Sequence, residues 1–85
     1  MEENLKKVGE VFKYFAKPMV AGIKITGSLS IGDKIKIKGA TTDIDMLVDS
    51  MQVDLKPVKN AKSGDEVGIK VPDKVRPNDM VYKVA

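Results

Sequence analysis

Apolar and polar residues alternate with a period of two in several short segments of this chain. In the segment 33–38, Ile35 and Ile37 point to one side of an extended backbone, and three Lys side chains point to the other. The same alternation recurs in the segments 23–25, 51–55 and 66–71. It is typical of strands with one buried and one solvated face. We therefore predict an all-β fold with four buried positions, Ile35, Ile37, Val67 and Ile69, and three exposed ones, Lys34, Lys36 and Lys70.

The N-terminal segment fits two interpretations. Leu5, Val8, Val11, Phe12 and Phe15 are spaced by three or four residues, which is typical of an amphipathic helix. The same segment is rich in β-branched and aromatic residues, which favours a strand. A glycine within it would cost a helix about 1 kcal/mol relative to alanine. The pattern alone leaves helix and strand open.

The residue types that the chain lacks exclude several kinds of site. Its 85 residues are enough for one domain. They include no Cys and no His, so disulfides, thiolate zinc sites and the commonest general base are absent. We therefore predict a protein that is not an enzyme and that binds no metal, nucleotide or other cofactor.

The chain has no apolar run long enough to span a bilayer, and its polar N-terminus has no core like that of a signal peptide. These features predict a cytoplasmic protein without a membrane partner. The excess of 14 Lys over one Arg, together with a single Gln, suits a thermophile.

Three predicted turns share one short motif. Gly32-Asp33, Gly64-Asp65 and Asn78-Asp79 each stand before an apolar residue that follows the Asp by two positions. Gly and Asn accept a positive φ, and Asp can bond nearby backbone as the next strand begins. Three copies of the motif predict three strands that start from the same kind of turn.

These turns resemble those of the second domain of elongation factor Tu and of the corresponding domains of initiation factor two. The resemblance lies in Gly27–Ile35, Ser50-Met51, Ala61–Ile69 and Arg76–Val81, and it covers residues 7–84. The chain is also similar to small stand-alone archaeal proteins described as translation-factor-like. The resemblance implies a closed, six-stranded Greek-key barrel formed by residues 1–85, with residues 1–6 as a loose arm and residues 8–16 as a strand.

The chain departs from that pattern at the sites that bind ligands. It has no Gly-x-x-x-x-Gly-Lys-Ser/Thr loop, so no GTPase site is expected. The positions that match the aminoacyl-end pocket hold Ser50, Val53 and Glu66, which do not preserve the family's contacts. The resemblance therefore implies a non-catalytic module, without binding of the aminoacyl end of tRNA.

A row of cations suggests a surface for RNA. Lys34, Lys36 and Lys38 lie on one face of a predicted strand, and Lys24 is expected on the adjoining strand. Such a row can contact phosphates, although solvent-facing Lys is also common on exposed strands. The predicted partner is tRNA or ribosomal RNA, and the predicted RNA-binding residues are Lys13, Lys17, Lys24, Lys34, Lys36, Lys38 and Arg76.

Three aromatic residues, Phe12, Tyr14 and Phe15, could form a platform for single-stranded RNA beside Lys13 and Lys17. The other interpretation is that they fill the interior of a small barrel. On a regular strand, Tyr14 would share a face with Phe12, and Phe15 would point the opposite way.

An alternative function is a protein-interaction module that packs against a separate partner. Residues 1–42 carry a net charge of +4 and residues 43–54 a net charge of −4. A continuous basic stripe, uninterrupted by Asp43–Asp54, would favour RNA. An exposed apolar patch on the folded surface would favour a protein partner.

Overall fold

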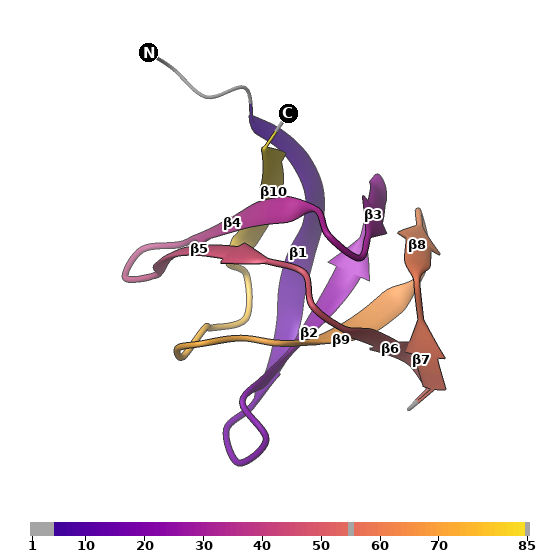
Figure 1. Ribbon diagram of the computed structural model, residues 1–85. Coiled ribbons are helices and arrows are strands. Elements are labelled where there is room, and N and C mark those ends of the chain that lie inside the picture. Colours follow the sequence, from indigo (N-terminus) through magenta and orange to yellow (C-terminus); the bar gives the residue numbers. More distant parts are fainter. Residues whose placement is uncertain (1–4, 55, 85) are drawn as a thin grey trace.

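The described part of the protein consists of β-strands joined by turns and by one longer loop, residues 71–79. The structure is a computed structural model that describes residues 5–54 and 56–84, and all regular structure in them is strand (Figure 1). The described part of the chain contains no helix with the length and apolar character that crossing a bilayer requires. The strands are β1 (Leu5–Phe15), β2 (Val20–Ile25), β3 (Ser28–Ser30), β4 (Lys34–Lys38), β5 (Asp43–Leu47), β6 (Met51–Val53), β7 (Lys56–Val58), β8 (Asn60–Lys62), β9 (Glu66–Lys70) and β10 (Met80–Val84).

Eight of these strands form one curved sheet in the order β5-β4-β10-β1-β2-β9-β6-β7, and β3 pairs with β8 in a second sheet. All pairings are antiparallel, so the predicted all-β, antiparallel fold is confirmed. The closed six-stranded barrel is not found, because within residues 5–54 and 56–84 no pairing joins the terminal strands β5 and β7. The chain bends at Thr26 and Gly27, which takes β3 out of the larger sheet.

The N-terminal segment is a strand, which decides between the two interpretations of its pattern. β1 pairs with β10 on one side and with β2 on the other, with a bulge between Lys7 and Gly9 and another between Val11 and Lys13. Bulges bend a strand and increase its twist, so this 11-residue strand curves along the core (Figure 1). The strand includes Leu5 and Lys6 of the predicted arm, and residues 1–4 lie outside the described residues.

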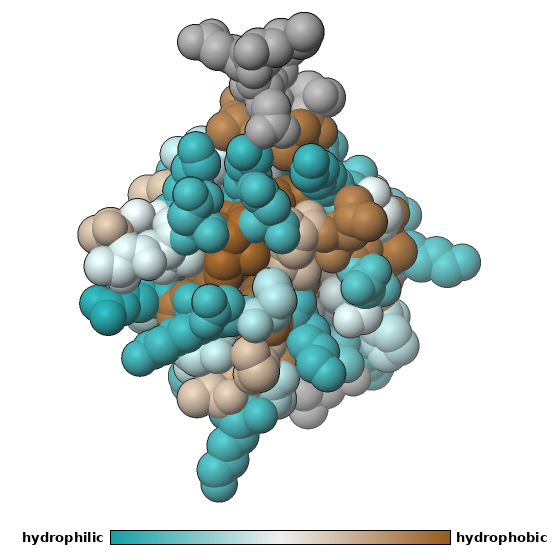
Figure 2. Space-filling view, turned by 60° about the vertical axis from the view of Figure 1, so that its left-hand side comes forward, coloured by the Kyte–Doolittle hydropathy of each residue, from teal (hydrophilic) through white to brown (hydrophobic). Residues whose placement is uncertain are grey.

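The apolar faces of the strands meet in one core. Ile35, Ile37, Val67 and Ile69 are at most 2% exposed, as the alternation predicts, and Lys34 and Lys70 are exposed. The Lys36 side chain is only 16% exposed, which corrects the prediction that it is exposed. Its Nζ lies 3.6 Å from Asp45 Oδ1, because β4 and β5 place the two residues directly opposite each other. Figure 2 turns the side of the molecule with the β4–β5 turn forward, and hydrophilic side chains dominate there.

The three Gly-Asp and Asn-Asp turns have the same geometry. Gly32, Gly64 and Asn78 have φ values of 93°, 97° and 78°. In each turn the Asp N–H donates to the carbonyl oxygen three residues earlier, at 3.0 to 3.1 Å. Its Oδ2 accepts a hydrogen bond from the N–H of that same residue, at 2.9 to 3.0 Å. A positive φ at the third position is the mark of a type II turn, so the predicted turn chemistry is present in all three.

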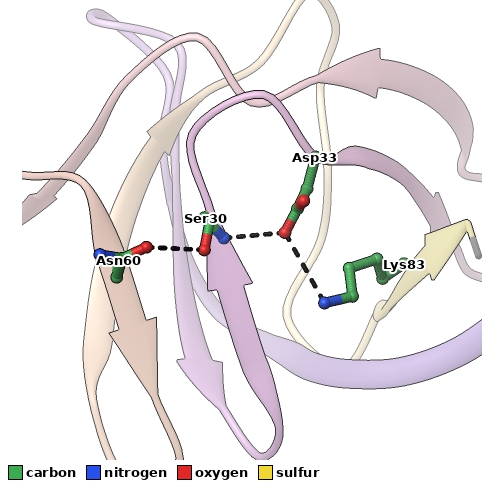
Figure 3. Close-up of polar contacts among 4 residues, drawn as sticks. All are labelled: Ser30, Asp33, Asn60 and Lys83. Carbon is green, nitrogen blue, oxygen red and sulfur yellow. Dashed lines mark hydrogen bonds and ion pairs between the residues drawn. The ribbon is translucent and has the colours of Figure 1, made fainter.

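The first of these turns also ties the two sheets together (Figure 3). Asp33 accepts the Ser30 N–H and lies 3.8 Å from Lys83 Nζ of β10. The Ser30 hydroxyl is 2.7 Å from Asn60 Oδ1 of β8, to which it can donate. The turn therefore links the β3–β8 pair to the larger sheet.

We expect Gly64→Val to destabilise the protein by more than about 1 kcal/mol, because a β-branched residue fits a φ of 97° poorly. Chemical denaturation measures this, with Ser63→Ala at the exposed neighbouring position as a control that should change stability by less than about 0.5 kcal/mol. Equal stability of Gly64→Val and the wild type would contradict the role of the turn.

Candidate functional site

A groove lies on the outer face of the larger sheet, over β1, β2, β9 and β6. Its volume is about 440 Å³. Side chains and backbone from these strands and their turns line it, namely Phe12, Phe15, Pro18, Val20, Gly22, Gln52, Asp54, Glu66, Val67 and Gly68. A second hollow continues it past Gln52 and Gly68 toward Ser50 and Lys70.

Two glycines form the floor of the groove. Gly22 and Gly68 are direct partners across β2 and β9, and Gln52 of β6 pairs with Gly68 on the other side. Their chain neighbours Ala21 and Ile69 face the core, so the glycines occupy positions that face outward. Neither position has a Cβ, but only Gly68 is partly exposed, because the Phe12 ring covers Gly22, which is buried. A glycine inside a strand often marks such a close approach of another group.

The aromatic wall consists of Phe12 and Phe15, which are 46% and 43% exposed. A Cβ on Gly22 would lie 3.1 Å from Phe12 Cζ, so the Phe12 ring leans over that glycine. Lys13 Nζ lies 5.0 Å from the centre of the Phe15 ring, within the range of a cation–π contact. Both phenylalanines line the same groove, whereas Tyr14 packs against the core.

This arrangement corrects the expectation for a regular strand, in which Phe12 and Tyr14 share a face. The bulge between Val11 and Lys13 inserts one residue into the alternation of β1. Phe12 and Lys13 both face outward as a result, and Tyr14 turns inward opposite Ala21. Neither the exposed aromatic pair nor its shared face could be read from the spacing.

The opposite wall of the groove is acidic. Glu66 precedes Gly68 by two residues on β9, and Asp54 follows Gln52 by two residues beyond β6. Because β6 and β9 run antiparallel through the pair Gln52–Gly68, both carboxylates lie on the same side of that pair. Lys24 lies opposite Glu66 across β2 and β9 and offsets one of these two negative charges.

The predicted lysine row lies next to the acidic segment rather than forming a basic stripe. Lys36 and Lys38 pair across the ladder with Asp45 and Asp43 of β5. Lys24 is not on the strand adjoining this row, because β10 and β1 lie between β4 and β2. Carboxylates therefore interrupt the lysine row. A continuous basic stripe was the feature expected for RNA binding, so this arrangement disfavours that function.

The other predicted cations are dispersed. Lys13 lies on β1, Lys17 lies in the turn that follows, and Arg76 lies in the turn before β10. The structure does not bring these three together with the row on β4. Binding of RNA by any of the seven residues stays a prediction.

The groove was not predicted from the sequence, because its signal lies in two glycines within strands. Gly22 and Gly68 stand at outward positions in alternating segments, which is the signal that could have indicated a groove floor. The register that pairs these two glycines across β2 and β9 could not have been predicted from either segment alone. Within the described residues, no group of three or more His, Cys, Asp or Glu side chains is arranged to hold a metal ion.

Comparison with known proteins relates this chain to peptidases. No protein-family model matches it. It is 42% identical over 77 residues to an uncharacterised protease of Methanocaldococcus jannaschii, which is 89% of this chain and 19% of that protein. It is 40% identical over 78 residues to a collagenase of Porphyromonas gingivalis, which is 89% of this chain and 22% of that protein. The chain thus spans about a fifth of the length of these relatives.

Solved structures show the same fold. The C-terminal domain of a Geobacillus thermoleovorans protein described as a U32 peptidase superposes with a TM-score of 0.87 at 17% identity, covering 94% of this chain and 93% of that one. Its selenomethionine form gives a TM-score of 0.86 at 16% identity, covering 89% of this chain and 96% of that one. The fold is therefore that of a domain already seen in isolation.

These comparisons overturn the resemblance to translation factors and the function inferred from it. The sequence relatives are named as a protease and a collagenase. The structural neighbours are domains of a protein that is described as a U32 peptidase. The prediction that the protein is not an enzyme is contradicted by the same names. The Gly-Asp turns misled because they meet a backbone requirement that unrelated small β-domains share, and fold alone does not determine function.

Proposed function

We propose that this chain is a protein-docking module that works with a peptidase-type catalytic domain, on the same polypeptide or a separate one. Its relatives carry a matching segment in about a fifth of their length, which supports a role beside a larger catalytic part. The groove over Gly22 and Gly68 is the proposed docking surface.

The observation that carries this proposal is the exposed pair Phe12 and Phe15. Exposed aromatic side chains beside a hollow are typical of interfaces with other proteins. Two observations support a protein partner over RNA: the exposed apolar surface of the groove, and the carboxylates that interrupt the lysine row.

The test uses the Methanocaldococcus jannaschii relative produced without the 77 residues that match this chain. We expect the chain to bind that truncated protein when the two are mixed, as measured by calorimetry. The double variant Phe12→Ser/Phe15→Ser should bind at least about tenfold more weakly, since buried aromatic anchors dominate such interfaces.

Leu47→Ser is the matched control. Leu47 is 56% exposed and lies on β5, at the far end of the sheet from the groove, so the variant should bind like the wild type. Circular dichroism would verify that all variants are folded. Absence of binding, or equal binding by the double variant, would contradict the proposal.

A further inference from the structure

The two sides of the groove differ in chemistry, because one is aromatic and the other is acidic. Its floor is the partly exposed backbone at Gly68, bordered by the Phe12 ring, which covers Gly22, and by the Phe15 ring. An apolar or aromatic side chain can lie across such a floor in contact with both rings. The volume of about 440 Å³ is at the small end of the range for ligand pockets, which suits one or two side chains.

The charged side chains around the groove determine which type of residue is favoured next to that apolar side chain. The charged side chains that line the groove are Asp54 and Glu66, both acidic. Even with Lys24 opposite Glu66, this wall has a net charge of −1. Two cations lie toward the other side: Lys70 lines the adjoining hollow, and Lys13 Nζ lies 5.0 Å from the centre of the Phe15 ring. A basic group is therefore attracted to the wall formed by Asp54 and Glu66, and repelled from the opposite side.

From these features we infer that the groove binds a protein segment in which an aromatic side chain stands beside a basic one, with the ring over Gly68 against Phe12 and Phe15 and the cation at Asp54 and Glu66. This inference rests on the proposed function, because it names the chemistry of the segment that docks. The proposed occupant is a segment of a partner domain, and a second copy of this chain is an outcome that the experiment below distinguishes.

The experiment titrates the ¹⁵N-labelled chain with short blocked peptides in a glycine–serine background. One peptide contains phenylalanine next to arginine, a second contains phenylalanine next to glutamate, and a third contains serine next to arginine. We expect the Phe–Arg peptide to shift the amide signals of Gly22 and Gly68. The Phe–Glu peptide should bind about tenfold more weakly, and the Ser–Arg peptide should leave those signals unchanged.

The double variant Asp54→Asn/Glu66→Gln tests the acidic wall directly. Asn suits position 54, where φ is 52°, so the backbone should be retained. We expect this variant to lose the preference for the Phe–Arg peptide, because with Lys24 remaining the wall no longer has a net negative charge. The matched control Asp73→Asn removes one charge from an exposed loop outside the groove, and it should keep the wild-type preference.

The inference is overturned if no peptide shifts Gly22 or Gly68, or if the double variant keeps its preference for arginine. It is also overturned if sedimentation shows a dimer of the chain that Phe12→Ser/Phe15→Ser disrupts, because the occupant would then be a second copy. These outcomes are distinct from failure of the proposed function. The truncated relative can bind in a way that depends on Phe12 and Phe15 while none of the peptides binds. In that case the proposed function holds, and only the inferred pairing of an aromatic with a basic side chain is wrong.

Discussion

Gly39→Ala should destabilise the protein by about 2–4 kcal/mol, a large part of the roughly 4–13 kcal/mol expected for a domain of this size. Gly39 lies in the turn between β4 and β5, and a Cβ there would collide with Asp79 Oδ1. Asp79 is 5% exposed and cannot move away freely, since its Oδ2 accepts the Arg76 N–H at 2.9 Å. Thermal unfolding should show a midpoint lower by roughly 10–20 °C.

The same clash predicts strong coupling between the two positions. Asp79→Ala removes the carboxylate and loses the turn hydrogen bond, so we expect it to cost about 1 kcal/mol. The double variant Gly39→Ala/Asp79→Ala should be about as stable as Asp79→Ala alone. Thr41→Ala, at an exposed position of the same turn, is the control and should change stability by less than about 0.5 kcal/mol. Additive effects of the two substitutions would show that the clash does not govern stability.

Ile37→Ala should destabilise the protein by about 2–5 kcal/mol. Ile37 is fully buried in β4, where it pairs with Val81 of β10 and Ile44 of β5. Truncation removes apolar contacts and leaves a cavity that neighbouring strands cannot close without breaking their pairing. Urea denaturation measures the loss, and Lys38→Ala, at the exposed next residue, should stay within about 0.5 kcal/mol of the wild type. A loss below about 1 kcal/mol for Ile37→Ala would contradict this assignment of the core.

Features that depend on local geometry could be predicted from the sequence. Ile35 and Ile37 are buried as their alternation indicates, because the side chains of a strand point to its two faces in turn. The type II turns at Gly32, Gly64 and Asn78 follow from the few residues that accept a positive φ. The resemblance to translation factors rested on these same turns, so it carried information about strand starts and none about a binding site.

The candidate site was much less predictable, because it depends on contacts between distant segments. Phe12 and Phe15 share a face only because a bulge shifts the alternation of β1 against β2. Gly22 and Gly68 form one floor only because the register of β2 and β9 pairs them. Bulge position and register are set by the packing of whole strands, and the spacing of residues within one segment does not determine them.

The sequence by itself determined the all-β class, the buried faces of regular strands such as β4 and β9, and the three turns, since each depends on the conformational preferences of neighbouring residues. Only the tertiary structure decided that, within residues 5–54 and 56–84, no pairing closes the sheet between β5 and β7, and that Asp43 and Asp45 lie against the lysine row. It also decided that Gly39 must be glycine, because Asp79 approaches it from 40 residues further along the chain. Such contacts arise when the strands curve around one core, and the energy of that packing is shared among segments that are far apart in sequence.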